Sequence, residues 1–451
     1  MQAIGFSAQN SPLTNFLWDG HLARPIQQTH EGQGSMTGLP QLSPTEQTTI
    51  QYLRSTQAIR DRCGVLFNLA NQDQLQHFRC DLTQLDFAAD YVIHVIQTNY
   101  PDLNVPFHSR WRHFEAGGVT RSATLDHLLA KQPPRERAKA KFDLAITSVL
   151  LDAGAGADWH YHEAETKKTF QRSEGLAVAS FHLFKTGGFS SSSAHPLQAD
   201  AIGLQNLSEP QFLEGFQITS DNPLVGVEGR IALMHQLGRA LQNSPDLFGA
   251  ATPRPGNLVD YLLQTSPSQL SAHTVFEAVL AGFSEIWAGR QSIAGINLGD
   301  VWLHSALSNQ GLGSQLVPFH KLSQWLTYSL LEPLQELGVQ ITELDRLTGL
   351  PEYRNGGLCL DAGLLQPKHP DILTTPYSPD SEVIVEWRAL TVILLDRIAD
   401  RIRQKLGLDQ QSLPLAKVLE GGTWAAGRQI AKEKRAGGIP PIQIISDGTV
   451  F

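Results

Sequence analysis

Residues 382–406 have the sequence EVIVEWRALTVILLDRIADRIRQKL, and they form the longest stretch of the chain with a helical pattern. Apolar residues recur every three or four positions, which is the repeat of an α-helix with one buried face. Gly407 follows directly, and glycine commonly occupies the position just after a helix end. This stretch therefore predicts a long amphipathic helix.

The same repeat occurs along most of the chain from Ser43 onward. Ser43-Pro44-Thr45-Glu46 is typical of a capped helix start. Only residues 439–446, a β-branched run before Asp447-Gly448, clearly predict a strand and turn. We therefore predict a mainly α fold with a little β near the C-terminus, and not a doubly wound sheet. The other expected helices are at 43–62, 122–131, 134–152, 171–185, 223–243, 272–289, 319–337 and 414–434.

Composition divides the chain into two parts. Residues 1–45 are rich in Gln, Ser, Thr, Gly and Pro and lack apolar periodicity, so they predict an irregular N-terminal arm. No composition change marks a linker after that point. Residues 46–451 are therefore expected to form a single helical domain, built as one body or as two closely packed lobes.

Charge and apolar content narrow the possible partners. The net charge of −9 argues against a nucleic-acid surface, which needs clustered Lys and Arg. No run approaches the roughly 18 apolar residues of a membrane-spanning helix, and residues 1–20 lack the pattern of a secretory signal. With only three cysteines, we expect a cytoplasmic protein with no nucleic-acid or membrane partner. The sequence does not indicate an oligomeric state.

Several common site motifs are missing. The sequence has no phosphate-binding loop of the GxxxxGK[ST] type, no GxGxxG, no GxSxG and no HExxH. Asp158, His160, His162 and Glu163 alternate along one segment, but without a distant third ligand a solvated loop is the commoner explanation. We expect neither a metal nor a cofactor.

Polar residues interrupt three apolar stretches in a way that suggests a lined pocket. Residues 317–329 are VPFHKLSQWLTYS, residues 350–357 are LPEYRNGG, and residues 386–388 are EWR. Cleavage of an N-glycosidic bond needs a carboxyl group beside the sugar cation or its attacking water, and cations that hold a phosphate. From residue types alone, Glu–Arg pairs that join helices are the commoner explanation.

Longer phrases carry a resemblance to a known family. The phrases are RHFEAGG at 112–118, TSVLLDAGAG at 147–156, NPLVGVEGR at 222–230, EGGTWAAGR at 420–428 and SDGTVF at 446–451, together with 318–330 and 350–357. On these phrases the chain is identified as an almost end-to-end member of the fungal and bacterial uracil-catabolism protein family. That resemblance implies a pathway that converts uracil into its nucleotide, opens the ring and ends with urea. One step of such a pathway must release urea from ribose 5-phosphate.

A second, more distant similarity implies the chemistry of that step. The queuosine 5'-phosphate N-glycosidases carry FYKRAQ, FADYR and EIR in the order in which this chain has FHKLSQ (319–324), LPEYR (350–354) and EWR (386–388). The similarity implies a helical DNA-glycosylase-like architecture. It places the catalytic aspartate of those enzymes at Glu352, one methylene longer, and their lysine at Lys321. The Val-Pro-Gln that follows in those enzymes is replaced here by residues 355–357, NGG.

The resemblances together predict an N-glycosidic hydrolase that converts ribosylurea 5-phosphate into urea and ribose 5-phosphate. Glu352, Lys321 and Glu386 are the expected catalytic residues, and the proton donor to urea is left open among Glu386, Asp361 and Glu174. Two alternatives remain: a non-catalytic binding or scaffold subunit of the uracil pathway, and a uracil phosphoribosyltransferase, which usually needs an α/β sheet and a phosphate loop. The expected substrate-binding residues are His320, Gln324, Tyr353, Arg354, Asp361, Arg388 and Glu174.

Overall fold

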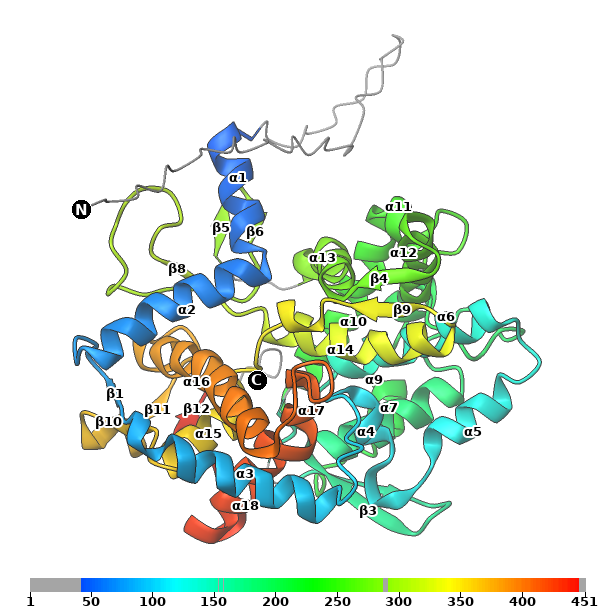
Figure 1. Cartoon of the computed structure of the whole chain (residues 1–451). Coiled ribbons are helices and arrows are strands. Elements are labelled where there is room, and N and C mark those ends of the chain that lie inside the picture. Colours follow the sequence, from blue (N-terminus) through cyan, green and yellow to red (C-terminus); the bar gives the residue numbers. More distant parts are fainter. Residues whose placement is uncertain (1–41, 153, 157, 287–290, 446–451) are drawn as a thin grey trace, which may run out of the picture. The chain divides into compact units, whose positions relative to one another are not determined.

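The computed structural model describes residues 42–152, 154–156, 158–286 and 291–445. Helices dominate this part of the chain (Figure 1), so the predicted mainly α fold is confirmed. Residues 1–41 of the expected arm lie outside the described residues, as do residues 287–289 of one expected helix and residue 446 of the expected strand. The α-helices are α1 (Pro44–Leu53), α2 (Thr56–Asn71), α3 (Leu85–Asn99), α4 (Arg110–Phe114), α5 (Arg121–Leu128), α6 (Pro134–Leu150), α7 (Arg172–Lys185), α8 (Ala201–Gln205), α9 (Glu209–Gly215), α10 (Val227–Asn243), α11 (Pro245–Phe248), α12 (Leu258–Thr265), α13 (Ala272–Phe283), α14 (Lys321–Glu336), α15 (Tyr353–Asp361), α16 (Glu382–Leu406), α17 (Leu415–Val418) and α18 (Trp424–Lys434).

The longest helix, α16, has the bounds that its sequence predicts. It ends at Gly407, whose φ of 65° lies in the left-handed region that glycine adopts without strain. Its apolar face packs against α2 and α3, and its second turn also buries Glu386 and Arg388. Buried charged residues need polar partners. This end of α16 is therefore expected to take part in an ordered polar network.

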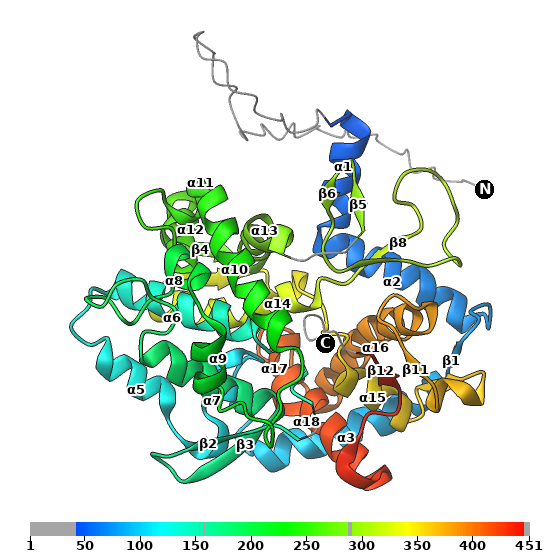
Figure 2. The same cartoon turned by 180° about the vertical axis from the view of Figure 1, so that it is seen from behind.

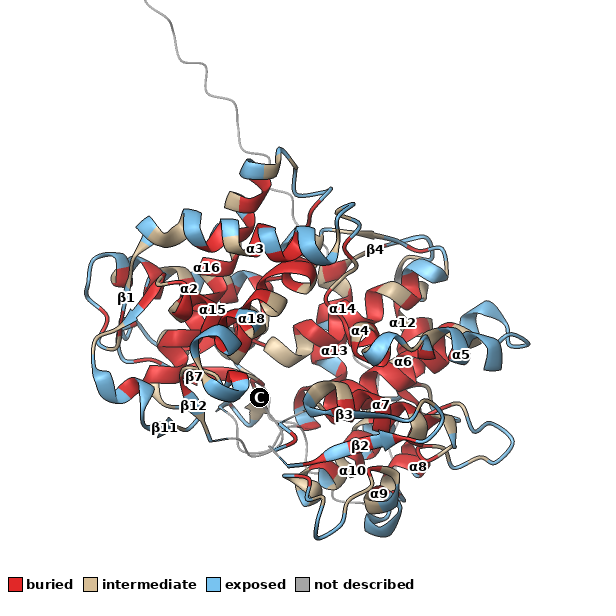
Figure 3. Cartoon of the chain, turned by 90° about the horizontal axis from the view of Figure 1, so that it is seen from below, coloured by how far each residue is buried: buried red, intermediate tan, exposed pale blue. Residues whose placement is uncertain are grey.

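A second group of helices surrounds α14. This helix packs against α6 and α13, and Figure 3 shows buried residues concentrated where α14 meets α6. Seen from behind in Figure 2, α8 and α10 to α13 gather on the same side of the domain. Helix α6 also packs against α7, so α6 contacts both α7 and the distant α14.

Helix α15 lies between α16 and α18, and it begins beside a close backbone approach. A Cβ on Gly427 of α18 would lie 2.2 Å from the backbone oxygen of Arg354. Only glycine allows α18 to come this near to the first turn of α15. This approach brings the α18 side chains next to those that open α15.

Helix boundaries differ from expectation at several places. Arg54 and Ser55 separate α1 from α2, and Gly226, in a left-handed conformation, delays the start of α10. The expected helix at 414–434 is interrupted by a π-helix at Leu419–Thr423. In the described ranges, no helix is both long and apolar enough to cross a bilayer.

The β structure is more scattered than expected. The described residues contain six two-stranded sheets. Only β12 lies in the stretch where a strand was predicted, and it pairs with β11 in parallel. The others have two to four residues each, too few for the alternating pattern that identifies a strand. The strands are β1 (Phe78–Cys80), β2 (His160–Glu163), β3 (Lys168–Gln171), β4 (Gln269–Ser271), β5 (Ser292–Ile293), β6 (Ile296–Asn297), β7 (Val301–Leu303), β8 (Leu316–Pro318), β9 (Gln340–Thr342), β10 (Leu365–Pro367), β11 (Pro376–Tyr377) and β12 (Gln443–Ile444).

Candidate functional site

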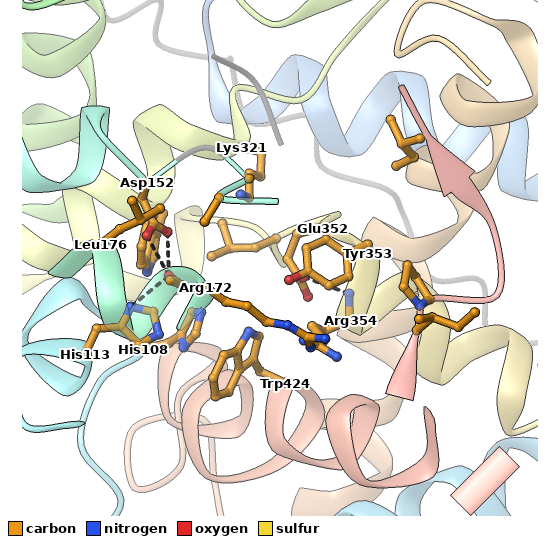
Figure 4. A pocket seen from close by; sticks show the side chains of 18 of the residues that line it. His108, His113, Asp152, Arg172, Leu176, Lys321, Glu352, Tyr353, Arg354 and Trp424 are labelled. Carbon is orange, nitrogen blue, oxygen red and sulfur yellow. Dashed lines mark hydrogen bonds between the residues drawn. The ribbon is translucent and has the colours of Figure 1, made fainter. Parts of the chain in front are cut away.

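A cavity of about 400 Å³ lies among the ends of α4, α6, α7, α14, α15 and α18. Figure 4 shows Glu352, Tyr353 and Arg354 on one side of it and His108, His113 and Asp152 on the other. Such a volume accommodates a small organic molecule. The lining residues are His108, His113, Asp152, Gly154, Ala155, Gly156, Arg172, Ser173, Leu176, Lys321, Trp325, Leu350, Glu352, Tyr353, Arg354, Trp424, Ile439, Pro440, Ile442 and Ile444.

Glu352 is held in the cavity wall by the helix that follows it. Its backbone is extended, and its two carboxylate oxygens accept the backbone N–H groups of Arg354 (2.7 Å) and Asn355 (2.6 Å) at the start of α15. Burial raises the pKa of Glu352, whereas these N–H groups and the charge of Lys321 favour the carboxylate. Each oxygen keeps a second lone pair, so the fixed carboxylate can still accept a proton or orient a water.

Lys321 opens α14 and supplies a positive charge that no described carboxylate pairs with. The backbone of His320 is left-handed, with φ of 47°, and the Lys321 N–H donates to Asp300 Oδ2 at 3.0 Å. Burial lowers the pKa of Lys321, and the charges of Glu352 and Asp152 act in the opposite direction. Among the described residues its ammonium has no hydrogen bond or ion pair, and it lies 5.8 Å from the ring centroid of Trp325.

Two arginines add to the positive charge of the cavity. Arg354 is 6% exposed and stacks over the Tyr353 ring at 4.8 Å from its centroid. Its Nη1 donates to the Gly438 oxygen at 3.4 Å, while its buried Nε has no partner in the described part of the chain. Arg172 lines the same cavity and opens α7 with φ of 54°. Together with Lys321, these guanidinium groups can bind an anion such as a phosphate.

Asp152 stands on the other side, at the end of α6. Ser173 Oγ lies 2.7 Å from both carboxylate oxygens, and Arg110 Nη1 donates to Oδ1. Burial raises the pKa of Asp152, and the charge of Arg110 and the Ser173 hydrogen bond oppose that rise. The fully buried Arg110 also donates through Nε to Ser148 Oγ at 2.8 Å. Side chains from α4, α6 and α7 thus fix this carboxylate.

Four histidine and tryptophan rings line the same cavity. His113 is 5.5 Å from Trp325 and 5.6 Å from Trp424, and His108 is 6.3 Å and 5.9 Å from the same two indoles, measured between ring centroids. Burial, followed by the charge of Arg110, holds the pKa of His113 well below its usual value. Both causes favour the neutral imidazole of His113.

Two further predicted residues, Gln324 and Arg388, lie behind the cavity wall. Gln324 is buried and connects to Thr348, whose N–H donates to Gln324 Oε1 at 2.7 Å, so it supports the segment leading to Glu352. Arg388 forms a bidentate pair with Asp300 at 2.8 and 2.7 Å. Since Asp300 also accepts the Lys321 N–H, Arg388 acts on the position of Lys321 through one intermediate residue.

Four other predicted residues do not line the cavity. Glu386 is fully buried, and its Oε1 accepts the N–H groups of His77 and Phe78. Its Oε2 lies 3.6 Å from His304 Nε2. The other three are His320, which bonds to the Leu53 oxygen, Asp361, which pairs with Arg435, and Glu174, which pairs with Arg428.

Several cavity residues were given no role by sequence reasoning. His113, Asp152 and Trp424 fall within phrases that carried the family resemblance, so that resemblance contained a signal for them. His108 and Arg172 fall in none of the quoted phrases, and no motif pointed to them. These two residues reach the cavity through the packing of distant segments.

The alternating Asp158–Glu163 segment does not converge on a metal. Its last four residues form β2 (His160–Glu163), where Tyr161 and Glu163 are buried while His160 and His162 are exposed. Glu163 instead pairs with Arg121 and His182. Within the described ranges, no group of three His, Cys, Asp or Glu residues could hold a metal ion.

Comparison with known proteins places the chain in a family. A protein-family model described as "Protein of unknown function (DUF1688)" matches residues 52–451. The chain belongs to the DUF1688 family. This DUF1688 protein is 38% identical over 442 residues to "Uracil catabolism protein 4" of Lachancea kluyveri, covering 90% of the chain and 100% of the relative. It is 40% identical over 414 residues to "Protein urg3" of Schizosaccharomyces pombe, covering 89% and 99%. The family membership expected from the sequence is thus confirmed.

Proposed function

We propose that this protein hydrolyses the N-glycosidic bond of ribosylurea 5-phosphate, giving urea and ribose 5-phosphate. The observation that carries the proposal is the composition of one cavity: a helix-held carboxylate, Glu352, faces a second carboxylate, Asp152, and the cations Lys321, Arg172 and Arg354 line the same space. The name "Uracil catabolism protein 4" of one relative supports a substrate from uracil breakdown.

One carboxylate and three cations of the cavity have a role in this reaction. Cleavage develops positive charge at C1 of the ribose, and the carboxylate of Glu352 stabilises that charge or accepts a proton from the attacking water. Lys321, Arg172 and Arg354 hold the phosphate and orient the sugar. Arg388 supports Lys321 through Asp300, and Glu386 joins α16 to the start of β1 behind the wall. The proposal retains a helical DNA-glycosylase-like architecture and uses no metal or cofactor.

A binding or scaffold subunit is the second candidate. It is favoured by the use of both Glu352 oxygens as a helix cap, because a capping carboxylate needs no catalytic role. Such a subunit would bind ribosylurea 5-phosphate without turnover, and replacing Glu352 by Gln would leave the affinity unchanged. A nucleotide formed from uracil and an activated ribose phosphate would instead indicate the less favoured phosphoribosyltransferase.

Release of urea and ribose 5-phosphate by the purified protein, with and without a chelator, tests the proposal. We expect chelator-resistant turnover, and a decrease in kcat of about 10² to 10⁴ in Glu352→Gln, the usual loss when an acid or base is removed. Asp200→Asn is the matched control. Asp200 is also a buried carboxylate, 2% exposed. It caps a helix by accepting the Gly203 N–H at 2.9 Å, but it lies outside the cavity. Absence of turnover in the wild-type protein would refute the hydrolase.

A further inference from the structure

Urea is a poor leaving group, so the proposed hydrolysis needs a proton donor on the leaving-group side of the ribose. The three carboxyl groups considered from the sequence, Glu386, Asp361 and Glu174, are not part of the cavity lining. On the side opposite Glu352, the lining instead contains His108, His113 and Asp152. These three residues are the candidates for the proton donor on that side.

His108 has the surroundings of a histidine that transfers protons. It is 3% exposed, and its Nδ1 lies 2.7 Å from Glu420 Oε2. Among the described residues, the hydrogen bond to Glu420 engages Nδ1, and no described group bonds to Nε2. A carboxylate on Nδ1 fixes the ring orientation and keeps the proton at Nδ1, which leaves Nε2 as the reactive nitrogen.

The segment around Glu420 holds His108 at two points. The His108 N–H donates to the Ala416 oxygen at 2.9 Å, and Glu420 follows in the π-helix Leu419–Thr423. Single π turns inside helices often occur at functional sites. Gly421, the next residue, has no room for a side chain, because a Cβ there would lie 2.7 Å from a side-chain atom of Val105. The carboxylate is therefore presented to His108 by an unusual and tightly packed turn.

The other two residues are less suited to donate a proton. Burial and the charge of Arg110 keep His113 neutral, and its Nδ1 lies 3.3 Å from Arg110 Nη1, so it accepts there. Burial raises the pKa of Asp152, and its hydrogen bonds from Arg110 and Ser173 oppose that rise; both of its oxygens already accept from Ser173. His108 alone of the three combines a carboxylate partner with an uncommitted ring nitrogen.

We propose that His108 is the catalytic residue that protonates the leaving nitrogen, and that Glu420 is the positioning residue that orients it. This inference rests on the proposed hydrolase function and adds its missing acid. The imidazolium donates its Nε2 proton as the C1–N bond breaks, and the bond electrons remain on the urea nitrogen. Water bonds to C1 and gives a proton to Glu352. The products are neutral urea and ribose 5-phosphate, and solvent returns the proton from Glu352 to His108.

Leaving-group dependence provides the test, because an acid is needed only when the leaving group is basic. Two substrates are compared: ribosylurea 5-phosphate, and ribose 5-phosphate carrying 4-nitrophenolate at C1, which departs without protonation. For His108→Asn we expect kcat on the urea substrate to fall by about 10² to 10⁴, and kcat on the nitrophenyl substrate to fall by less than about 10-fold. Glu420→Gln should show the same selectivity with a smaller loss, whereas Glu352→Gln should impair both substrates.

His182→Asn is the matched control, because His182 also pairs with a buried carboxylate, Glu163, at 2.7 Å, and it lies outside the cavity. It should leave both reactions unchanged. Equal losses on both substrates in His108→Asn would overturn the inference and indicate a structural role, as would full activity on the urea substrate. In either case an active wild-type protein impaired by Glu352→Gln leaves the hydrolase standing. A wild-type protein inactive on both substrates refutes the hydrolase and this inference with it.

Discussion

The two sides of the cavity are built differently. On one side Lys321 and Glu352 are fixed at the starts of α14 and α15, where backbone N–H groups meet carboxylates. On the other side Asp152 and His108 are fixed by side chains from other segments, namely Ser173, Arg110 and Glu420. The first side depends on helix ends, and the second depends on pairs of side chains. Substitutions should therefore damage the two sides in different ways.

Removing the anchor of the first side should have the largest effect on stability. Asp300 accepts two hydrogen bonds from Arg388, which is 2% exposed, and one from the Lys321 N–H. Asp300→Ala leaves a buried guanidinium without this carboxylate, so we expect the free energy of unfolding to fall by about 3–5 kcal/mol. Urea denaturation measures the loss, and turnover should decrease as well because Lys321 is displaced.

Asp73→Ala is the control for that experiment. Asp73 also forms a bidentate pair with an arginine, Arg79, at 3.0 and 2.8 Å, but both side chains are about half exposed. An exposed pair contributes only about 0–1 kcal/mol. Equal shifts in the two variants would contradict the view that Asp300 anchors this side of the cavity.

Removing the charge of Lys321 should have an intermediate effect, and it should weaken the binding of phosphorylated ligands only. Lys321→Met keeps much of the side chain but removes the ammonium, and a hydrogen bond to a charged group is worth about 1.5–3 kcal/mol. We expect the dissociation constant of ribose 5-phosphate to rise about 10- to 150-fold, with little change for unphosphorylated ribose. Calorimetry measures the dissociation constants of both sugars. Lys131→Met, at an exposed position, is the control. An equal loss for both sugars would argue against phosphate binding at Lys321.

The sequence predicted the parts of the molecule that depend on local pattern. The bounds of α16 follow from a long apolar repeat and a final glycine. Lys321, Glu352 and Arg354 were predicted because each lies in a short motif that resembles one of the queuosine 5'-phosphate N-glycosidases, and these three line the cavity. Strand β2 was missed because one of its two buried positions is the charged Glu163, so its alternation is not an apolar one.

The second side of the cavity depends on contacts that no local pattern encodes. Asp152 ends one helical segment and Ser173 belongs to the next, with the β2–β3 hairpin between them. His108 and Glu420 are separated by 312 positions. Glu386 shows the converse: its motif was recognisable, but packing of α16 turns it toward the N–H groups of His77 and Phe78. Tertiary packing decides which polar residues share a cavity.

The smallest predicted effect concerns the side-chain pair that defines the second side. Burial raises the pKa of Asp152, and the hydrogen bond from Ser173 opposes that rise, so Ser173→Ala should raise the pKa further. If the carboxylate form of Asp152 is the active one, activity is lost as the pH falls through this pKa, and the acidic limb of kcat/KM must move to higher pH. At neutral pH we expect kcat/KM to decrease only about 2- to 10-fold, the worth of one hydrogen bond.

Ser271→Ala is the control. It removes the α13 cap to Thr274 outside the cavity, and it should lower stability without moving the acidic limb. A limb unchanged in Ser173→Ala would show that Asp152 is not the group that titrates.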